Sequence, residues 1–180
     1  MGTPKTIEAK AVLAALERLA AGIFERHAAT AELWLVGIAN GGVPVAARLR
    51  KALEARGRPV RLGTVDISFH RDDIGRNPIP KESTPTSLPG DVTGATVVLV
   101  DDVLFTGRTV KAALDELFDH GRPSRVELAV LADRGGRTLP IAADYAGLSV
   151  TAAAGETVAV VLDSAQPDND IIRIGRTGTL

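Results

Sequence analysis

The stretch that most constrains the fold is VVLVDDVLFTGRT, residues 97–109. It starts with four aliphatic residues, 97–100, and such a run bounded by polar residues is typical of a strand buried on both faces of a parallel sheet. Asp101 and Asp102 follow at the predicted strand end, and a small-residue turn leads into helical spacing of apolar residues over 110–118. Unpaired N–H groups and the positive end of a helix dipole converge at such a turn, so the stretch predicts a phosphate site.

An acidic pair about one turn from a phosphate site suits a ribose 5-phosphate. The stretch resembles the phosphoribosyl pyrophosphate (PRPP) fingerprint of type I phosphoribosyltransferases. With the later segments, it is most similar to the PyrR family, the pyrimidine operon attenuation proteins with uracil phosphoribosyltransferase activity. Two alternatives stay open: an ordinary glycine-bearing strand-to-helix turn, and a receiver-type Mg²⁺ site at an acidic pair. The motif fits neither the Walker A pattern nor the Rossmann fingerprint.

Strand and helix patterns alternate along the chain, which favours an α/β fold. The resemblance implies the type I phosphoribosyltransferase fold, a central parallel sheet flanked by helices with a small hood over the nucleobase. We expect one domain over residues 1–180, with a flexible loop at about 72–93 and hood segments at about 133–150 and 158–174. Strands are expected at 32–38, 59–68, 97–100, 126–132, 158–162 and 171–174, and helices at 6–27, 45–55 and 110–118.

Composition narrows the class of protein. With 45% hydrophobic residues and a formal net charge of −1, the chain can bury a proper core and gives no reason to expect indiscriminate nucleic-acid or membrane binding. It has no cysteine, which excludes disulfides, thiolate catalysis and thiolate metal sites. Neither a signal-peptide pattern nor an apolar run of about 20 residues is present. We therefore expect a cytoplasmic protein.

A second glycine-bearing turn, Ala39-Asn40-Gly41-Gly42, follows the first predicted strand and precedes a helix with Pro44 in its first turn. Taken alone, it is a tight turn. Beside the PRPP fingerprint, it resembles the family's pyrophosphate loop. Attenuator members carry basic and hydroxyl side chains where this chain has Ala39, Asn40 and Gly41, so only backbone N–H groups and the Asn40 amide are left to hold pyrophosphate.

The long polar segment after Ser68 contains four prolines, and loops of this length are often functional lids. The resemblance implies a flexible loop that closes over PRPP and excludes water. Arg71 at its base then meets the pyrophosphate. The alternative is that Arg71 pairs with Asp72 or Asp73. His70 is expected to be a packing residue.

The pattern DRGGR-x-LPI-x-ADY-x-G again resembles PyrR, where this region belongs to the hood. The resemblance assigns Asp133, Arg134, Arg137 and Val158 to the base side of the site. Charged residues after a parallel strand point toward the ligand crevice in open α/β sheets. Arg134 and Arg137 are otherwise solvated or salt-bridged. His27 is expected to be a favourable charge at a helix C-terminus rather than a ligand.

The resemblance also implies the roles of the central motif. Asp101 and Asp102 hold the ribose 2- and 3-hydroxyls and bind Mg²⁺, directly or through substrate oxygens. The ligands are PRPP and uracil or uridine monophosphate (UMP). Some purine-using relatives carry an acidic residue at the position of Phe105, which favours a pyrimidine here. The 5-phosphate site consists of Val103, Leu104, Phe105, Thr106, Gly107, Arg108 and Thr109.

A regulator that binds pyrimidine operon leader RNA, with little catalysis, is the alternative from another functional class. In the attenuator members, the RNA contacts resemble a basic patch formed by the pyrophosphate loop and the segment after DRG. This chain keeps Arg137 there but has uncharged residues where basic or histidine side chains are expected: Ala39, Gly41, Gly136, Ala142 and Leu148. Lost cations weaken RNA binding, because phosphate neutralisation supplies much of the affinity. Transfer to another base, such as hypoxanthine, also stays open. The resemblance suggests a homodimer or a larger homo-oligomer.

Overall fold

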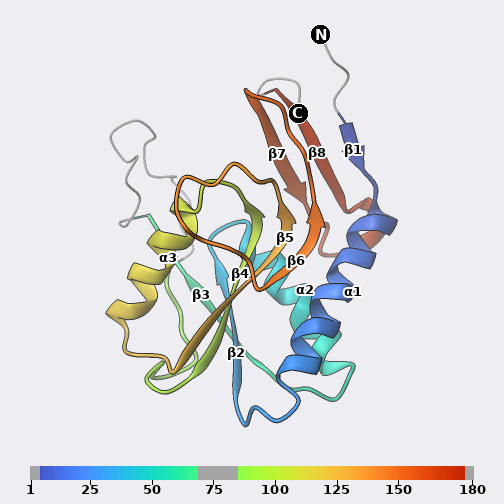
Figure 1. Cartoon of the computed structure of the whole chain (residues 1–180). Coiled ribbons are helices and arrows are strands. Elements are labelled where there is room, and N and C mark those ends of the chain that lie inside the picture. The colour runs from blue at the N-terminus through green and yellow to red at the C-terminus, as the bar shows by residue number, and fades with distance from the viewer. Residues whose placement is uncertain (1–4, 69–84, 177–180) are drawn as a thin grey trace.

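The computed structural model describes residues 5–68 and 85–176, and Figure 1 shows a large sheet between helices with a smaller sheet beside it. No helix in these two ranges is both long and apolar enough to cross a bilayer. The elements are β1 (Lys5–Ile7), α1 (Ala9–Arg26), β2 (Leu33–Ile38), α2 (Gly42–Glu54), β3 (Arg61–Val65), β4 (Thr96–Leu104), α3 (Arg108–Asp119), β5 (Arg125–Asp133), β6 (Tyr145–Ser149), β7 (Glu156–Val161), the 3-10 helix η1 (Pro167–Asn169) and β8 (Ile171–Arg176).

The large sheet has five parallel strands in the order β3-β2-β4-β5-β6. Its central strands are the aliphatic runs of the sequence, and all six residues of β2 are buried. Strand order reverses between β2 and β4, because β3 lies on the outer side of β2. In open parallel sheets, the ligand crevice lies at the carboxyl ends of the strands at such a reversal. The predicted α/β fold is therefore confirmed.

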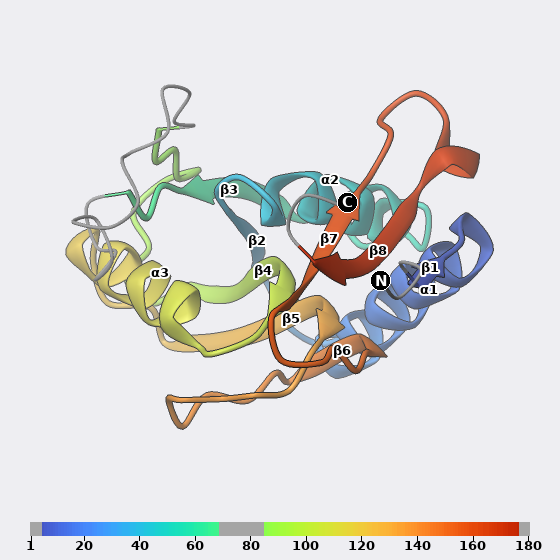
Figure 2. The same cartoon turned by 90° about the horizontal axis from the view of Figure 1, so that it is seen from above.

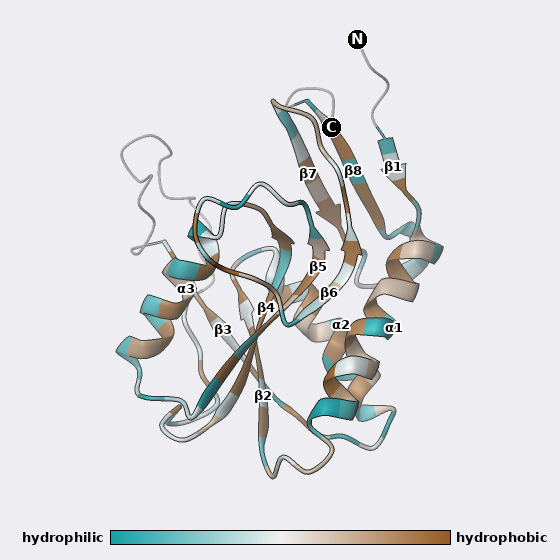
Figure 3. Ribbon diagram, in the orientation of Figure 1, coloured by the Kyte–Doolittle hydropathy of each residue, from teal (hydrophilic) through white to brown (hydrophobic). Residues whose placement is uncertain are grey.

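Helices cover both faces of this sheet (Figure 2). Helices α1 and α2 pack on one face and α3 on the other, and successive residues of β4 contribute to opposite sides: Val98 and Val100 to the first core, Val97 and Leu99 to the second. Figure 3 shows mostly hydrophobic strands between helices whose residues change between hydrophobic and hydrophilic. Amphipathic helices on a two-sided apolar sheet give the three layers.

The small sheet is antiparallel in the order β1-β8-β7. Its strand β7 contacts β4, so the small sheet lies against the strand that carries the acidic pair. Asp170, just before β8, is 1% exposed and accepts a hydrogen bond from Arg48 Nη2 of α2 at 3.1 Å. This pair joins the small sheet to α2, the helix that packs on the large sheet.

Three expected elements differ from the structure. Residues 5–7 form β1 rather than the start of α1, because they pair with β8, which is far away in the sequence. Residues 145–149, expected within the hood segment 133–150, form β6, the edge strand of the large sheet. Strand β4 continues through the acidic pair to Leu104, because β5 extends beside it to Asp133 and offers backbone partners.

The expected loop at 72–93 also differs in its described part. Residues 85–93 pack on the sheet: Ser87 and Thr64 exchange backbone hydrogen bonds of 2.8 and 2.9 Å, and Val92 is fully buried. The rest of the predicted loop lies outside the described residues, as do Arg71 and His70.

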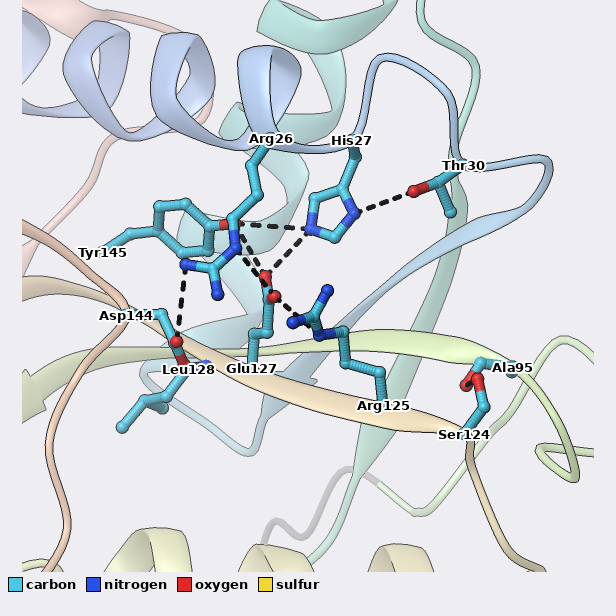
Figure 4. Close-up of polar contacts among 10 residues, drawn as sticks. All are labelled: Arg26, His27, Thr30, Ala95, Ser124, Arg125, Glu127, Leu128, Asp144 and Tyr145. Carbon is cyan, nitrogen blue, oxygen red and sulfur yellow. Dashed lines mark hydrogen bonds and ion pairs between the residues drawn. The ribbon is translucent and has the colours of Figure 1, made fainter.

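His27 lies at the C-terminal end of α1, as expected, but its ring is buried, at 2% exposed. Its Nδ1 lies 3.0 Å from Thr30 Oγ1 and its Nε2 lies 2.9 Å from Glu127 Oε2 (Figure 4). Tyr145 donates from its hydroxyl to the same Glu127 oxygen at 2.7 Å. The lone glutamate of β5 is thus the centre of a buried polar cluster that joins α1, β5 and β6.

Candidate functional site

The loop after β2 and the acidic pair of β4 meet at the reversal of the large sheet. An added Cβ on Gly41 would lie 2.5 Å from Asp102 Oδ2 and 2.6 Å from Oδ1, so the glycine backbone lies directly against this carboxylate. An added Cβ on Gly42 would lie 2.0 Å from the Val100 carbonyl oxygen. Gly42 lies against backbone, so a side chain cannot fit there, whereas a side chain at Gly41 would have to displace the Asp102 carboxylate. The structure thus brings together the predicted pyrophosphate loop, whose Ala39–Asn40 peptide bond is cis, and the predicted ribose site.

The two carboxylates of the pair lie in different surroundings. Asp101 is 4% exposed and accepts a hydrogen bond from the Asp102 amide at 3.0 Å, whereas Asp102 is partly exposed. Burial, followed by the neighbouring negative charge of Asp102, raises the pKa of Asp101 well above its usual value. Asp101 therefore holds its proton more tightly than a surface carboxyl group. Asp102 is the member of the pair that a ligand can reach.

The predicted 5-phosphate site follows as the turn between β4 and α3. We call residues 105–109 the phosphate loop. Gly107 caps α3 with a left-handed backbone, φ +92°, which favours glycine. The Arg108 amide donates to Thr106 Oγ1 at 3.3 Å, and the first N–H groups of α3 have no carbonyl of their own helix to bind. Thr109 is exposed beside them. This geometry is that of an anion site at a helix N-terminus.

The segment after β5 lies against the phosphate loop. The Arg134 guanidinium stacks over the Phe105 ring, 3.8 Å from its centroid. Arg137 pairs with Asp133 at 2.6 Å and also donates to the Phe105 carbonyl at 2.9 Å. Burial alone would raise the pKa of Asp133, but hydrogen bonds from Arg137 and from the Gly135 amide hold it below its usual value. Arg137 is thus salt-bridged rather than solvated, and its predicted place on the base side stays a prediction.

The remaining predicted base-side residue lies in the small sheet. Val158 is partly buried in β7, opposite Ile174 of β8, and packs against the core between the large sheet and α1. The same strand, β7, also contacts β4. Val158 therefore lies toward the face of the large sheet opposite α3.

The residues present fit a magnesium ion only together with substrate oxygens. Mg²⁺ prefers oxygen ligands and is commonly held by one or two carboxylates plus phosphates and water. Asp102 offers such a carboxylate at the crevice. In the part of the chain that the structure describes, no group of three or more His, Cys, Asp or Glu side chains could hold a metal by itself.

Sequence reasoning missed the cluster around Glu127 and the contact between Gly136 and Phe105. An added Cβ on Gly136, whose φ is +73°, would lie 2.6 Å from Phe105 Cε2. The first had a usable signal, a single carboxylate inside the aliphatic run VELAVLA of β5. The second had none, because it depends on how the 133–141 segment folds back.

Comparison with known proteins agrees with this geometry. The family model for the phosphoribosyl transferase domain matches residues 5–164. A protein of Roseiflexus sp. (strain RS-1), named Bifunctional protein PyrR, is 46% identical over 179 residues, covering 98% of this chain and 97% of that protein. Its namesake from Chloroflexus aurantiacus is 46% identical over 175 residues, covering 96% of each chain. The chain belongs to the PyrR family of phosphoribosyltransferases.

Solved structures show the same fold at low identity. The hypoxanthine phosphoribosyltransferase of Trypanosoma cruzi superposes with a TM-score of 0.70 at 20% identity, covering 94% of this chain and 95% of that one. A hypoxanthine-guanine phosphoribosyltransferase of Bacillus anthracis gives a TM-score of 0.68 at 18% identity, covering 98% and 100%. At these identities the likeness concerns the fold. The resemblance to PyrR that the DDVLFTGRT and DRGGR segments indicated is confirmed, and it extends over nearly the whole chain.

Proposed function

We propose that this PyrR-family protein is a uracil phosphoribosyltransferase that converts uracil and PRPP to UMP and pyrophosphate with Mg²⁺. The observation that carries the proposal is the contact between Gly41 and the Asp102 carboxylate. It supports one ligand that spans both sides of the crevice, with a ribose on Asp102 and a diphosphate at the loop after β2. The phosphate loop lies at the end of the same strand, β4, and would take the 5-phosphate.

In this proposal the chain binds and orients rather than forming a covalent intermediate. The base nitrogen forms a bond to C1 of the ribose as the C1–oxygen bond to pyrophosphate breaks, the nitrogen gives up its proton to the leaving pyrophosphate or to water, and positive charge develops on the sugar in the transition state. Asp102 would accept hydrogen bonds from the ribose hydroxyls, and Asp101 behind it would hold the Asp102 backbone in place by accepting from its amide. Backbone N–H groups of the phosphate loop would hold the far end of the ribose, so that C1 is fixed by both ends of the sugar.

The leaving group needs charge compensation that the loop after β2 supplies only through its backbone. Ala39 and Gly41 carry no charge, and Asn40 is neutral. Mg²⁺, held by Asp102 and by oxygens of PRPP, would neutralise part of the pyrophosphate charge. Arg71 remains the proposed cation from the chain for this group.

Two observations bear on the base. Phe105, stacked under Arg134, stands where purine-using relatives carry an acidic side chain, and this supports uracil. The curated relatives are PyrR proteins. The structural similarity to hypoxanthine enzymes is at 20% identity or less and does not weigh against uracil.

A second candidate function is favoured by the relatives' name, which describes them as bifunctional. Binding of pyrimidine operon leader RNA would use cations around the crevice. Arg137 is occupied by Asp133 and by backbone carbonyls, and Gly136, Ala142 and Leu148 add no charge. We therefore rank transfer first, with the homodimer implied by the family resemblance as its proposed assembly.

The test offers uracil, hypoxanthine, guanine and orotate separately to the purified protein with PRPP and Mg²⁺. We expect UMP from uracil alone. Asp102→Asn should lower kcat/KM roughly 10- to 150-fold, because hydrogen bonds to a charged group contribute about 1.5–3 kcal/mol. Asp115→Asn, the same change on the outer face of α3, is the control and should leave the rate unchanged.

Nucleotide formed only from another base would overturn the choice of uracil. Absence of product with all four bases would overturn the enzyme proposal. Leader RNA would then be titrated at several salt concentrations, where each phosphate contact contributes about −0.9 on duplex and about −0.7 on single strands to the slope of log K against log salt.

A further inference from the structure

The carbonyl groups of residues 104–106, at the end of β4 and the start of the phosphate loop, bind the segment after β5. The Leu104 carbonyl accepts from the Arg134 amide at 3.0 Å and from Arg137 Nη1 at 3.3 Å. The Phe105 carbonyl accepts from Arg137 Nη1 at 2.9 Å. The Thr106 carbonyl accepts from the amides of residues 138 and 139 at 3.0 and 3.1 Å. Hydrogen bonds from one neighbouring segment thus orient the carbonyl groups of three consecutive residues.

This orientation fixes the donors of the phosphate loop. In a trans peptide group the C=O and the following N–H point in opposite directions. Among the described residues, the Ala39–Asn40 bond is the cis exception. With the carbonyls of 104–106 directed at the segment after β5, the amides of Phe105, Thr106 and Gly107 face away from it. They face the side on which the proposed function needs donors for the 5-phosphate.

Arg137 holds this arrangement at its centre. Its Nη1 donates to carbonyls, its Nη2 donates to Asp133 Oδ2 at 2.6 Å, and its Nε donates to the Ile141 carbonyl at 3.1 Å. All three guanidinium nitrogens are therefore engaged inside the chain. Two glycines with positive φ, Gly135 and Gly136, let the segment turn back so that the side chain reaches the loop. The Arg137 side chain is partly buried, at 23% exposed.

We propose that Arg137 is a positioning residue of the 5-phosphate site, acting through the carbonyls of Leu104 and Phe105, and is neither a base contact nor an RNA contact. The inference rests on the proposed function only in taking the phosphate loop as the site of a 5-phosphate. A lysine at this position could not replace the fork, because a single ammonium group cannot bind Asp133, the Phe105 carbonyl and the Ile141 carbonyl from one point.

The experiment compares Arg137→Lys with wild type and with Arg173→Lys, an exposed arginine of β8 as control. Ribose 5-phosphate binding is measured by calorimetry, which needs no turnover, and KM for PRPP and for uracil are measured separately. We expect Arg137→Lys to weaken ribose 5-phosphate binding and to raise the KM for PRPP, each at least tenfold. The KM for uracil should change less than twofold, and Arg173→Lys should match wild type.

A second variant keeps the test decisive if Arg137→Lys folds poorly. Asp133→Asn removes the ion pair but leaves the arginine and the volume of the site, and it should weaken ribose 5-phosphate binding about two- to fivefold. Unchanged ribose 5-phosphate binding in both variants overturns the inference. So does a raised KM for uracil alone, which would make Arg137 a base contact, or a loss of leader RNA binding alone, which would make it an RNA contact.

Failure of the proposed function gives a different result. If the wild-type protein binds ribose 5-phosphate but transfers it to no base, the proposed function fails, while the calorimetric comparison of Arg137→Lys still tests the inference. If the wild type does not bind ribose 5-phosphate, both fail.

Discussion

Tyr145→Phe tests the buried cluster around Glu127 by removing one oxygen atom. The Tyr145 hydroxyl donates to Glu127 Oε2 at 2.7 Å and lies 3.3 Å from His27 Nε2. The ring itself packs beside Gly22, where an added Cβ would lie 3.3 Å from Tyr145 Cδ1, and beneath the Arg26 guanidinium (Figure 4). Phenylalanine keeps these ring contacts, so the variant isolates the hydrogen bond.

The expected cost follows from the charge and burial of the acceptor. Glu127 is 3% exposed and keeps its contacts with His27, Arg26 and Arg125 in the variant. Hydrogen bonds to charged groups contribute about 1.5–3 kcal/mol, and this is the expected loss in the free energy of unfolding. For a chain of 180 residues, a loss of 1 kcal/mol lowers Tm by about 2–4 °C, so Tm should fall by about 3–12 °C.

Urea denaturation followed by the fluorescence of Trp34 measures this loss. Trp34 is the one tryptophan of the chain, is 2% exposed, and lies in the core on the α3 side of the sheet, so it reports unfolding without depending on Tyr145. Protein concentration is held constant, because association shifts apparent stability. Thr151→Ala, at an exposed position, is the control and should stay within about 0.5 kcal/mol. A loss below about 0.5 kcal/mol in Tyr145→Phe would refute the reasoning.

The pH dependence of the stability difference between wild type and Tyr145→Phe is an independent test. Burial would raise the pKa of Glu127, but hydrogen bonds from Tyr145 and His27 and the charge of Arg26 hold it below its usual value. A carboxyl group whose pKa is lowered by folding stabilises the protein above its unfolded pKa, about 4.3, and loses this contribution as the pH falls through the folded pKa. The difference between wild type and Tyr145→Phe should therefore shrink as the pH falls below about 4. A stability difference that grows as the pH falls would contradict the lowered pKa of Glu127.

Two further changes test the crevice and the small sheet. Gly41→Ala places a Cβ within 2.6 Å of the Asp102 carboxylate, at a backbone φ of −63° that alanine also adopts. The affinity for PRPP, measured by calorimetry, should therefore fall roughly tenfold while Tm stays nearly unchanged. Equal affinity would show that the carboxylate moves aside without loss of binding. Asp170→Ala removes the carboxylate that pairs with Arg48, which then keeps, among the described residues, only the Asp163 carbonyl, and it should cost about 3–5 kcal/mol in denaturant unfolding. A cost below about 1 kcal/mol would mean that water replaces the carboxylate.

The sequence was sufficient where local pattern and sheet geometry agree. Aliphatic runs identified β2, β4 and β5, and the turn before α3 indicated the proposed anion site, because strand burial and helix capping depend on neighbouring residues. Placing Asp102 beside Gly41 needed one more rule, that carboxyl ends of parallel strands share an edge. These parts of the site could therefore be predicted from short-range chemistry.

What the sequence could not supply depends on distant pairing. Strand β1 exists because β8 lies beside it, and nothing in the residues 5–7 alone excludes a longer α1. His27 lies at the end of an amphipathic helix, where an exposed charge is the ordinary expectation. It is buried because Glu127 of β5 and Tyr145 of β6 meet it there. Side-chain partners a hundred residues apart leave no periodic signal.

Arg137 gives the sharpest case of this limit, and it changes how the site is understood. The sequence left three roles open for it: base contact, solvated charge or salt bridge. Its ion pair with Asp133 spans four residues outside any helix and requires two glycines with positive φ between them. Once formed, it joins the segment on the predicted base side to the carbonyls of the phosphate loop. In the proposed function, the uracil site and the 5-phosphate site are therefore joined by one connected piece of backbone, so a change in the segment after β5 would reach the phosphate loop without contacting the phosphate.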